Sequence, residues 1–265
     1  MTDLVFVKLG GSLITDKRQE STPRHDTIAR LAQEFRTARD ARPDLPILLG
    51  HGSGSFGHWE AKKYHTRQGV ETPAQWHGFA RVSAAAARLN RLVTDAFLEA
   101  GVPVFSLQPS AATVAVAGQP HRLHTDAIER ALAHGLVPLI YGDVAFDRTW
   151  GGTILSTESL FSYLADNLHP RHILLFGNAP GVLDDRRQVI PRITPRNYAQ
   201  VTRHLRGAAS PDVTGGMADK VTQMLDLVRR IPGLHVWILT GNEPGNLHRA
   251  LLDPAAAPGT CIRGA

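Results

Sequence analysis

The sequence predicts an α/β protein: a three-layer α/β/α sandwich around a mainly parallel central sheet, with a projecting β-hairpin. Short apolar runs of strand length alternate along the chain with longer segments whose apolar residues recur at helical spacing. This alternation favours parallel strands whose connecting helices cover both faces of the sheet. With 43% apolar residues among 265, the chain can bury a sizeable core.

The expected strands are short runs rich in leucine, β-branched and aromatic residues, from "LVFVKL" at the start to "LHVWIL" near the end. We expect them at 4–9, 46–50, 102–107, 136–141, 171–176 and 234–239.

The expected helices lie between most of these runs, and two of them carry clear end signals. Thr125 precedes one helical segment, with Gly135 just past its end, and Pro195 opens another segment after Thr194. We expect helices at 26–41, 74–100, 125–134, 157–168, 195–205 and 216–230.

One segment departs from the alternation. The run "DVAFDRTWGGTIL" at 143–155 is typical of a hairpin, with Gly151 and Gly152 near its turn. Because the chain shows no internal repeat and no low-complexity linker, we expect a single domain over 1–265. The segment "NLHPRH" near residue 170 separates two apolar stretches and divides this domain into lobes of about 1–170 and 171–265.

The charge pattern argues against nucleic acid and membrane partners. The net charge is +5, but the arginines are scattered through helical segments and form no long basic run. The chain has no basic leader followed by an apolar segment, and no apolar stretch long enough to cross a bilayer. We therefore expect a cytoplasmic protein.

Lysine is rare in this chain, with five lysines among 29 basic residues. Lys8, Lys17 and Lys220 each lie close to a glycine-rich segment. A compact, flexible ammonium at such places indicates a role that a planar guanidinium does not fill. The adjacent Lys62 and Lys63 fit a solvated surface.

Three glycine-rich loops follow expected strands or precede an expected helix: "KLGGS" at 8–12, "GHGSGSFGH" at 50–58 and "DVTGGMADK" at 212–220. Glycine lets backbone amides approach anions closely, and loops at the carboxyl ends of parallel strands form the binding crevice. None of the loops has the P-loop spacing or a well-placed GxGxxG pattern. The set predicts a polyphosphate site.

Five segments together resemble the amino acid kinase family, and within it the isopentenyl phosphate kinases: "KLGGSLITDK", "GHGSGSFGH", "VPLIYGDV", "ILSTESL" and "TGGMADK". The resemblance implies the amino acid kinase fold, with an acceptor-binding first lobe and a nucleotide-binding second lobe. It implies transfer of a phosphoryl group from ATP to isopentenyl phosphate, Mg²⁺ carried by the nucleotide rather than by a protein metal site, and a homodimer.

The resemblance also assigns site residues. It implies that His58 contacts the acceptor phosphate together with Gly52 and Gly57, and that Lys17 stabilises the transferring group. The nucleotide-binding residues that it implies are Lys8, Gly10, Gly11, Ser12, Ser53, Gly216 and Lys220.

Two segments depart from the family pattern. Where relatives have an aspartate that orients the lysines, this chain has "STES", which places Thr157 at the acceptor and Glu158 at the lysines. Where relatives have "TDVDG" beside the nucleotide, this chain has "FGNAPG", so Asn178 replaces a carboxylate.

The chemistry requires charge neutralisation more than a base. A phosphate monoester is largely dianionic at neutral pH, so the acceptor needs no general base, and His58 is interpreted as a hydrogen-bond donor. The segment after residue 76 offers an apolar wall, where Phe79 and Val82 border the small residues 83–87. A helix-packing face is the alternative interpretation of that run.

Two alternative functions stay open from the sequence. Fosfomycin kinase, a related enzyme, shares the phosphate-binding histidine. A catalytically silent nucleotide-binding protein on the same fold is compatible with Glu158 and Asn178.

Overall fold

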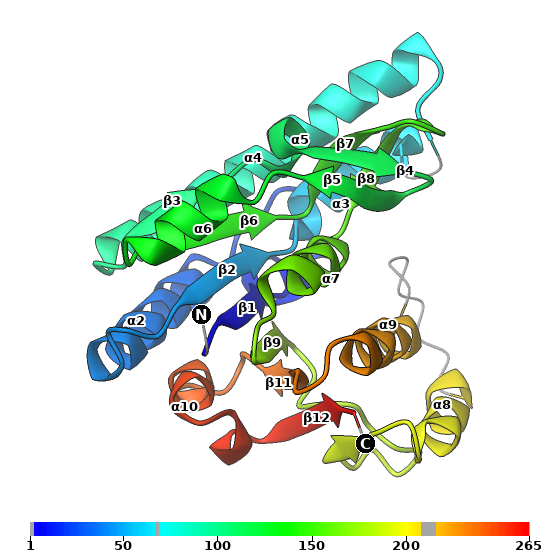
Figure 1. Cartoon of the computed structure of the whole chain (residues 1–265). Coiled ribbons are helices and arrows are strands. Elements are labelled where there is room, and N and C mark those ends of the chain that lie inside the picture. Colours follow the sequence, from blue (N-terminus) through cyan, green and yellow to red (C-terminus); the bar gives the residue numbers. More distant parts are fainter. Residues whose placement is uncertain (1–2, 67–68, 208–215, 265) are drawn as a thin grey trace.

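The fold is built on one eight-stranded sheet with the strand order β10-β12-β11-β9-β1-β2-β6-β3. We describe it from a computed structural model that covers residues 3–66, 69–207 and 216–264. All neighbouring strands are parallel except β11 and β12 (Figure 1). The mainly parallel central sheet expected from the sequence is confirmed. Its strands are β1 Val5–Leu9, β2 Ile47–His51, β3 Val104–Ser106, β6 Val137–Tyr141, β9 His172–Gly177, β10 Arg192–Ile193, β11 His235–Thr240 and β12 Gly259–Arg263.

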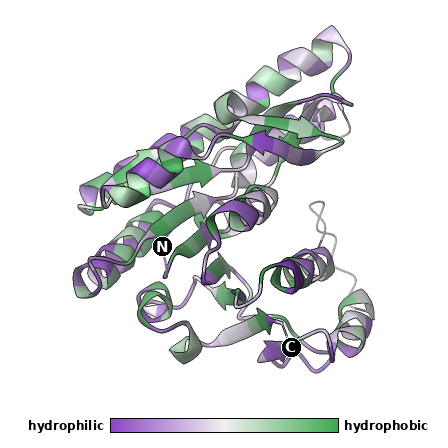
Figure 2. Cartoon of the chain, viewed as in Figure 1, coloured by the Kyte–Doolittle hydropathy of each residue, from purple (hydrophilic) through white to green (hydrophobic). Residues whose placement is uncertain are grey.

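Helices cover both faces of this sheet. Alternate residues of β1 enter different cores: Val5 and Val7 pack with α2, α4 and α10, whereas Phe6 packs with α6, α7 and α9. Hydrophobic strands therefore lie between helices with hydrophilic outer faces (Figure 2). The helices are α1 Gly11–Ile14, α2 His25–Ala41, α3 Gly54–Tyr64, α4 Pro73–Glu99, α5 Pro109–Ala112, α6 Asp126–Ala133, α7 Thr157–Leu168, α8 Tyr198–Gly207, α9 Met217–Arg230, α10 Asn246–Leu252 and the 3-10 turn Pro254–Ala256.

The expected hairpin is present as β7 (Asp143–Asp147) and β8 (Gly151–Leu155). It does not stand alone, because β7 also pairs with β4 (Thr113–Val116), which pairs with β5 (Gln119–Leu123). This second, four-stranded sheet lies near α3 at the upper right of Figure 1.

Two helix starts differ from the expected ones. Thr125 is the N-cap residue of α6, but its hydroxyl donates to the Glu129 side chain instead of capping the backbone. The segment after Thr194 begins with a turn held by Asn197, so α8 starts at Tyr198 rather than at Pro195.

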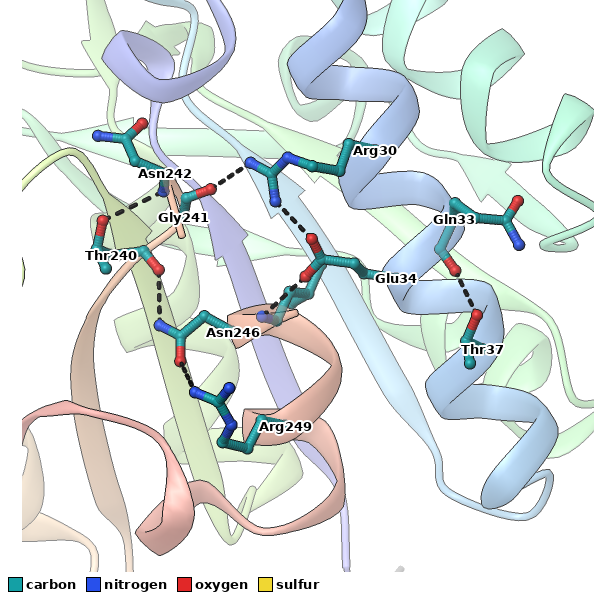
Figure 3. Close-up of polar contacts among 10 residues, drawn as sticks. Arg30, Gln33, Glu34, Thr37, Thr240, Gly241, Asn242, Asn246 and Arg249 are labelled. Carbon is teal, nitrogen blue, oxygen red and sulfur yellow. Dashed lines mark hydrogen bonds and ion pairs between the residues drawn. The ribbon is translucent and has the colours of Figure 1, made fainter. Parts of the chain in front are cut away.

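The two expected lobes share the continuous sheet, because β1 pairs with β9 along its whole length. A polar cluster also links them (Figure 3). Arg30 on α2 donates to the Gly241 carbonyl after β11, and Glu34 accepts from the backbone of Leu247 on α10. The start of α10 thus rests on a helix from the first half of the chain.

Among the described residues, no helix is both long and apolar enough to cross a bilayer.

Candidate active site

A cavity of about 850 Å³ opens at the carboxyl edge of the central sheet. Parallel strands bring their carboxyl ends together there, as the register pairs Leu9 with His51 on one side and with Phe176 on the other. All but one of the residues predicted from the sequence line this cavity. They are Lys8, Gly10, Gly11, Ser12, Lys17, Gly52, Ser53, Gly57, His58, Val82, Thr157, Glu158, Asn178, Gly216 and Lys220.

The first two glycine loops pack directly against each other. A Cβ atom on Gly11 would lie 2.4 Å from the Gly54 nitrogen, and one on Gly52 would lie 2.9 Å from the Gly11 nitrogen. Any side chain at these positions would therefore separate the loops. The close packing explains why the chain has glycine in both loops at the cavity floor.

Thr15 joins the same two loops by hydrogen bonds. Its hydroxyl donates to the Gly11 carbonyl at 2.7 Å and accepts from the Ser55 backbone at 2.9 Å. Gly54, between them, has φ +52°, and a Cβ there would meet the Thr15 hydroxyl at 2.2 Å. The backbone amides at the starts of α1 and α3 are thus held side by side, an arrangement suited to an anion.

Glu158 lies between two lysines from distant parts of the chain. Its carboxylate forms an ion pair with Lys8, and the Lys220 ammonium lies 3.5 Å from the same oxygen. Lys8 follows Phe6 by two residues on β1, so its side chain points to the face of the sheet that carries α7, where Glu158 lies.

The charges of this cluster affect one another. Burial acts to raise the pKa of the Glu158 carboxyl, but Lys8 and Lys220 outweigh it and hold that pKa well below its ordinary value. Burial lowers the pKa of the Lys8 ammonium, and the ion pair with Glu158 opposes this shift. The longer Glu158 side chain therefore reaches both lysines, even though the family pattern has aspartate.

His58 lies on the first turns of α3, facing the cavity. Its Nδ1 is 2.6 Å from the Gly54 carbonyl oxygen, which only accepts, so Nδ1 carries the hydrogen of this bond. A second donor from the ring requires the protonated imidazolium.

Thr157 and Asn178, which lie in the two segments that depart from the family pattern, have backbone partners. The Thr157 hydroxyl is buried and donates to the His51 carbonyl at 2.6 Å, which ties the start of α7 to the end of β2. The side-chain amide of Asn178 donates to the Ser12 carbonyl at 3.0 Å, which ties the end of β9 to the first glycine loop.

One side of the cavity is apolar. Val82 on α4 lines it, together with Ile154 on β8 and Ala61 on α3, which sequence reasoning did not identify. Phe79 is absent from the lining. It packs one layer behind, within ring-contact distance of Trp76 and Phe146 and in a small core with Val82.

The cavity offers few acidic metal ligands. Among the described residues its carboxylates are Glu158, which is paired with lysines, and Asp219 on the first turn of α9. The described residues contain no group of three or more His, Cys, Asp or Glu side chains that could hold a metal ion. The predicted third glycine loop is described only from Gly216 on, so 212–215 lie outside the described residues.

Comparisons with known proteins agree with this geometry. The sequence matches the amino acid kinase family over residues 3–240. It is 33% identical to isopentenyl phosphate kinase of Methanocaldococcus jannaschii over 94% of this chain and 95% of that protein. It is 35% identical to isopentenyl phosphate kinase of Haloferax volcanii over 93% of this chain and 98% of that protein.

A solved isopentenyl phosphate kinase structure superimposes on the fold with a TM-score of 0.82 at 29% identity, covering 98% of this chain and all of the other. These matches confirm the predicted phosphotransferase and the predicted resemblance to isopentenyl phosphate kinases. The chain belongs to the amino acid kinase family.

Proposed function

We propose that this protein transfers the γ-phosphoryl group of ATP to isopentenyl phosphate, which yields isopentenyl diphosphate for isoprenoid biosynthesis. The observation that carries the proposal is one cavity in which two packed glycine loops and three lysines meet an apolar wall. Relatives named isopentenyl phosphate kinase match the chain over nearly its full length.

The reaction exchanges one phosphorus–oxygen bond for another. The bond from the γ-phosphorus to the bridging oxygen of ADP breaks, and an oxygen of the acceptor phosphate forms the new bond. Because the acceptor is already dianionic, no proton has to leave it. Charge neutralisation and positioning therefore supply the catalysis.

The lysines supply that neutralisation. Lys8 and Lys220 face the phosphates from opposite lobes, and Glu158 holds both ammonium groups in place before the nucleotide arrives. Lys17, exposed after the first loop, contacts the transferring group. Gly10, Gly11, Ser12 and Ser53 present the loops to the nucleotide, with Gly216 and Asn178 on the far side.

Mg²⁺ enters with ATP in this proposal. Glu158 is occupied by two lysines, and Asp219 is the remaining carboxylate on the described cavity wall, so the nucleotide phosphates are the main ligands. Bound there, Mg²⁺ neutralises phosphate charge.

The acceptor lies between His58 and the apolar wall. Gly52, Gly57 and the His58 ring hold its phosphate, and Val82 and Ile154 contact the five-carbon tail, with Phe79 behind them. This wall favours a prenyl phosphate over fosfomycin, whose small polar body gains little from apolar contact.

The lobes, the compartment and the assembly are part of the same proposal. The acceptor binds mainly to residues of about 1–170 and the nucleotide mainly to about 171–265, in a cytoplasmic homodimer. Light scattering of the purified protein measures its oligomeric state.

The direct test follows the product. Purified protein is incubated with ATP, Mg²⁺ and isopentenyl phosphate, and phosphorus NMR follows the reaction. We expect coupled diphosphate signals of a new prenyl product to grow with those of ADP. ADP that forms with free inorganic phosphate instead would contradict the proposal.

A further inference from the structure

His51 is a buried titratable residue directly beneath the acceptor loop, and it does not line the cavity itself. Its side chain is completely buried at the end of β2, and its ring stacks on Tyr141 with centroids 5.5 Å apart and planes 8° apart. Nothing in the phosphoryl transfer described above uses this ring, although it precedes two cavity-lining residues, Gly52 and Ser53.

Both ring nitrogens of His51 have polar partners. Nδ1 lies 3.1 Å from the Gly52 carbonyl oxygen, and Nε2 lies 3.2 Å from the side-chain oxygen Oδ1 of Asn90 on α4. The other end of that amide contacts the Ser106 hydroxyl at 2.6 Å. The three side chains form a polar chain, buried at His51 and Asn90, that ends on the backbone of the acceptor loop.

The ring in this chain is neutral. Burial lowers the pKa of the His51 imidazole to about 4. A neutral ring has one N–H, and the Gly52 carbonyl can only accept, so the hydrogen lies on Nδ1. In the structure the Asn90 oxygen faces Nε2 and the Asn90 nitrogen donates to Ser106. With the hydrogen on Nδ1, Nε2 is an acceptor, so it pairs with Asn90 when the amide is turned over by about 180°. The amide nitrogen then donates to Nε2 and the Ser106 hydroxyl donates to the amide oxygen.

The backbone around His51 is fixed on its other sides too. The His51 carbonyl accepts from the Thr157 hydroxyl at 2.6 Å and from the Gly142 backbone at 3.1 Å. The Gly52 N–H donates to the Leu9 carbonyl at 3.0 Å. The peptide between Gly52 and Ser53 is the next one along, and the His51 ring holds its carbonyl.

The orientation of that peptide has a direct consequence. In a planar trans peptide the carbonyl and the following N–H point in opposite directions. Because the Gly52 carbonyl points to the buried His51 ring, the Ser53 N–H points away from the ring. Ser53 lines the cavity, and backbone N–H groups of such a loop are suited to bind a phosphate.

We propose that His51 is a positioning residue for phosphoryl transfer: anchored through Asn90 to Ser106, its ring holds the Gly52 carbonyl and aims the Ser53 N–H at the transferring phosphoryl group. The proposal rests on the proposed ATP-dependent transfer. A fixed donor of this kind stabilises developing charge without reorganisation during the reaction. If the ring is lost, the peptide can rotate and the donor leaves its place.

Two substitutions separate the ring's two contacts. In His51→Asn the amide nitrogen occupies the place of Nδ1, two bonds from Cβ, and still donates to the Gly52 carbonyl. In His51→Gln the amide nitrogen occupies the place of Nε2, so the contact with Asn90 survives and the contact with Gly52 is lost. Both variants lose the stacked ring, so a purely structural role of His51 predicts a similar loss of kcat in both.

We expect kcat of His51→Gln to fall by about tenfold to a hundredfold, the scale of one misplaced donor, and kcat of His51→Asn to stay within about fivefold of wild type. Thr94→Val is the matched control. Thr94 is a buried residue on α4 whose hydroxyl donates to the Asn90 backbone carbonyl. It should lower the melting temperature and leave kcat unchanged.

Equal kcat in correctly folded Asn and Gln variants would overturn the proposal. If both variants fail to fold, Asn90→Ala tests the proposal instead. Asn90 lies outside the cavity, and its removal takes away the side-chain contact that holds the His51 ring. We expect kcat of Asn90→Ala to fall several-fold in a folded protein that still binds ATP, with an affinity no weaker than that of His51→Gln, and a wild-type kcat would overturn the proposal.

A binding measurement separates this proposal from the proposed function. Calorimetry measures binding of a non-hydrolysable ATP analogue, which needs no prenyl acceptor. We expect His51→Gln to bind it several-fold more weakly than His51→Asn does, and equal affinities would count against the role of His51. If the wild-type protein binds the analogue but phosphorylates no prenyl phosphate, the proposed function is wrong. The comparison of the two affinities would still test the role of His51.

Discussion

The carboxylate of Glu158, on the first turn of α7, forms an ion pair with the buried ammonium group of Lys8 on β1. The pair joins two elements that are 150 residues apart in sequence, and Lys220 on α9 completes it at 3.5 Å. Removal of one partner from such a buried cluster leaves an uncompensated charge, which costs more than the pair itself contributes.

We therefore expect Glu158→Gln to lower stability in a pH-dependent way. The folded-state pKa of Glu158, about 2, lies below its ordinary value of 4.5. The ionised carboxylate thus stabilises the folded protein above about pH 4.5, and this contribution is lost as the pH falls towards 2. Urea unfolding of wild type and variant between about pH 3 and pH 7 measures the difference in free energy of unfolding.

The difference should be largest near neutrality and shrink at acid pH. Glu71→Gln, which changes an exposed loop carboxylate, is the matched control and should follow wild type throughout. A Glu158→Gln difference that is constant with pH would contradict a stabilising charge at this position.

Lys17 is expected to act on the transition state. We expect Lys17→Ala to lower kcat by about a hundredfold or more with a smaller change in ATP affinity, because it removes one donor to developing charge. Lys17→Arg should retain little of the wild-type kcat, since the planar guanidinium group does not replace a compact ammonium. Steady-state kinetics decide this, with Lys62→Ala, an exposed lysine on α3, as the control. Wild-type turnover in Lys17→Ala would remove the assignment.

His58 is expected to donate to the acceptor phosphate and to transfer no proton. His58→Ala should lose nearly all activity, while His58→Gln and His58→Asn retain a measurable part. Since Nδ1 already donates to Gly54, Gln should retain more than Asn, because its amide reaches the place of the other ring nitrogen. The measurement is kcat/KM for isopentenyl phosphate. Equal inactivity of folded Gln and Ala variants that still bind the acceptor would restore a proton-transfer role.

Val82 is expected to limit the length of the acceptor. Val82→Ala enlarges the apolar wall and should raise kcat/KM for ten-carbon relative to five-carbon monophosphates. Phe79→Ala should give a smaller shift and a larger loss of stability, because Phe79 packs behind the wall.

The control is Val93→Ala, a buried α4 position in the core that α4 shares with α2 and the central sheet, which should leave the preference unchanged. If neither Val82→Ala nor Phe79→Ala moves the preference, α4 does not contact the tail.

Most long helices and six strands of the central sheet were predictable from their strong apolar patterns; these strands are β1, β2, β3, β6, β9 and β11. The helix α3 was not expected, since Gly54 and Gly57 at its start are typical of a loop. Those glycines are required by packing instead, as a Cβ on Gly57 would lie 2.6 Å from the Ser53 hydroxyl. Strands β5 and β12 were also missed, because Pro120 and Gly259 disfavour a strand until a partner strand pairs with them.

The site was predictable where residue type and motif coincide, as for the glycines and Lys8. The position of individual side chains in the folded protein was not predictable from the sequence. Phe79 and Val82 share a helix face at a spacing of three residues, yet only Val82 reaches the cavity. Ile154 does line it, because the β7–β8 hairpin folds over the sheet edge, and no local pattern marks that contact.

Phosphoryl transfer to isopentenyl phosphate is measured by ADP release from ATP across a panel of acceptors: isopentenyl phosphate, dimethylallyl phosphate, fosfomycin, acetylglutamate and buffer alone. We expect kcat/KM for isopentenyl phosphate to exceed that for fosfomycin and acetylglutamate by about tenfold or more, the scale set by burying a branched hydrocarbon tail. A higher kcat/KM for fosfomycin, or no ADP release above buffer with any acceptor, would contradict the proposed transfer to isopentenyl phosphate.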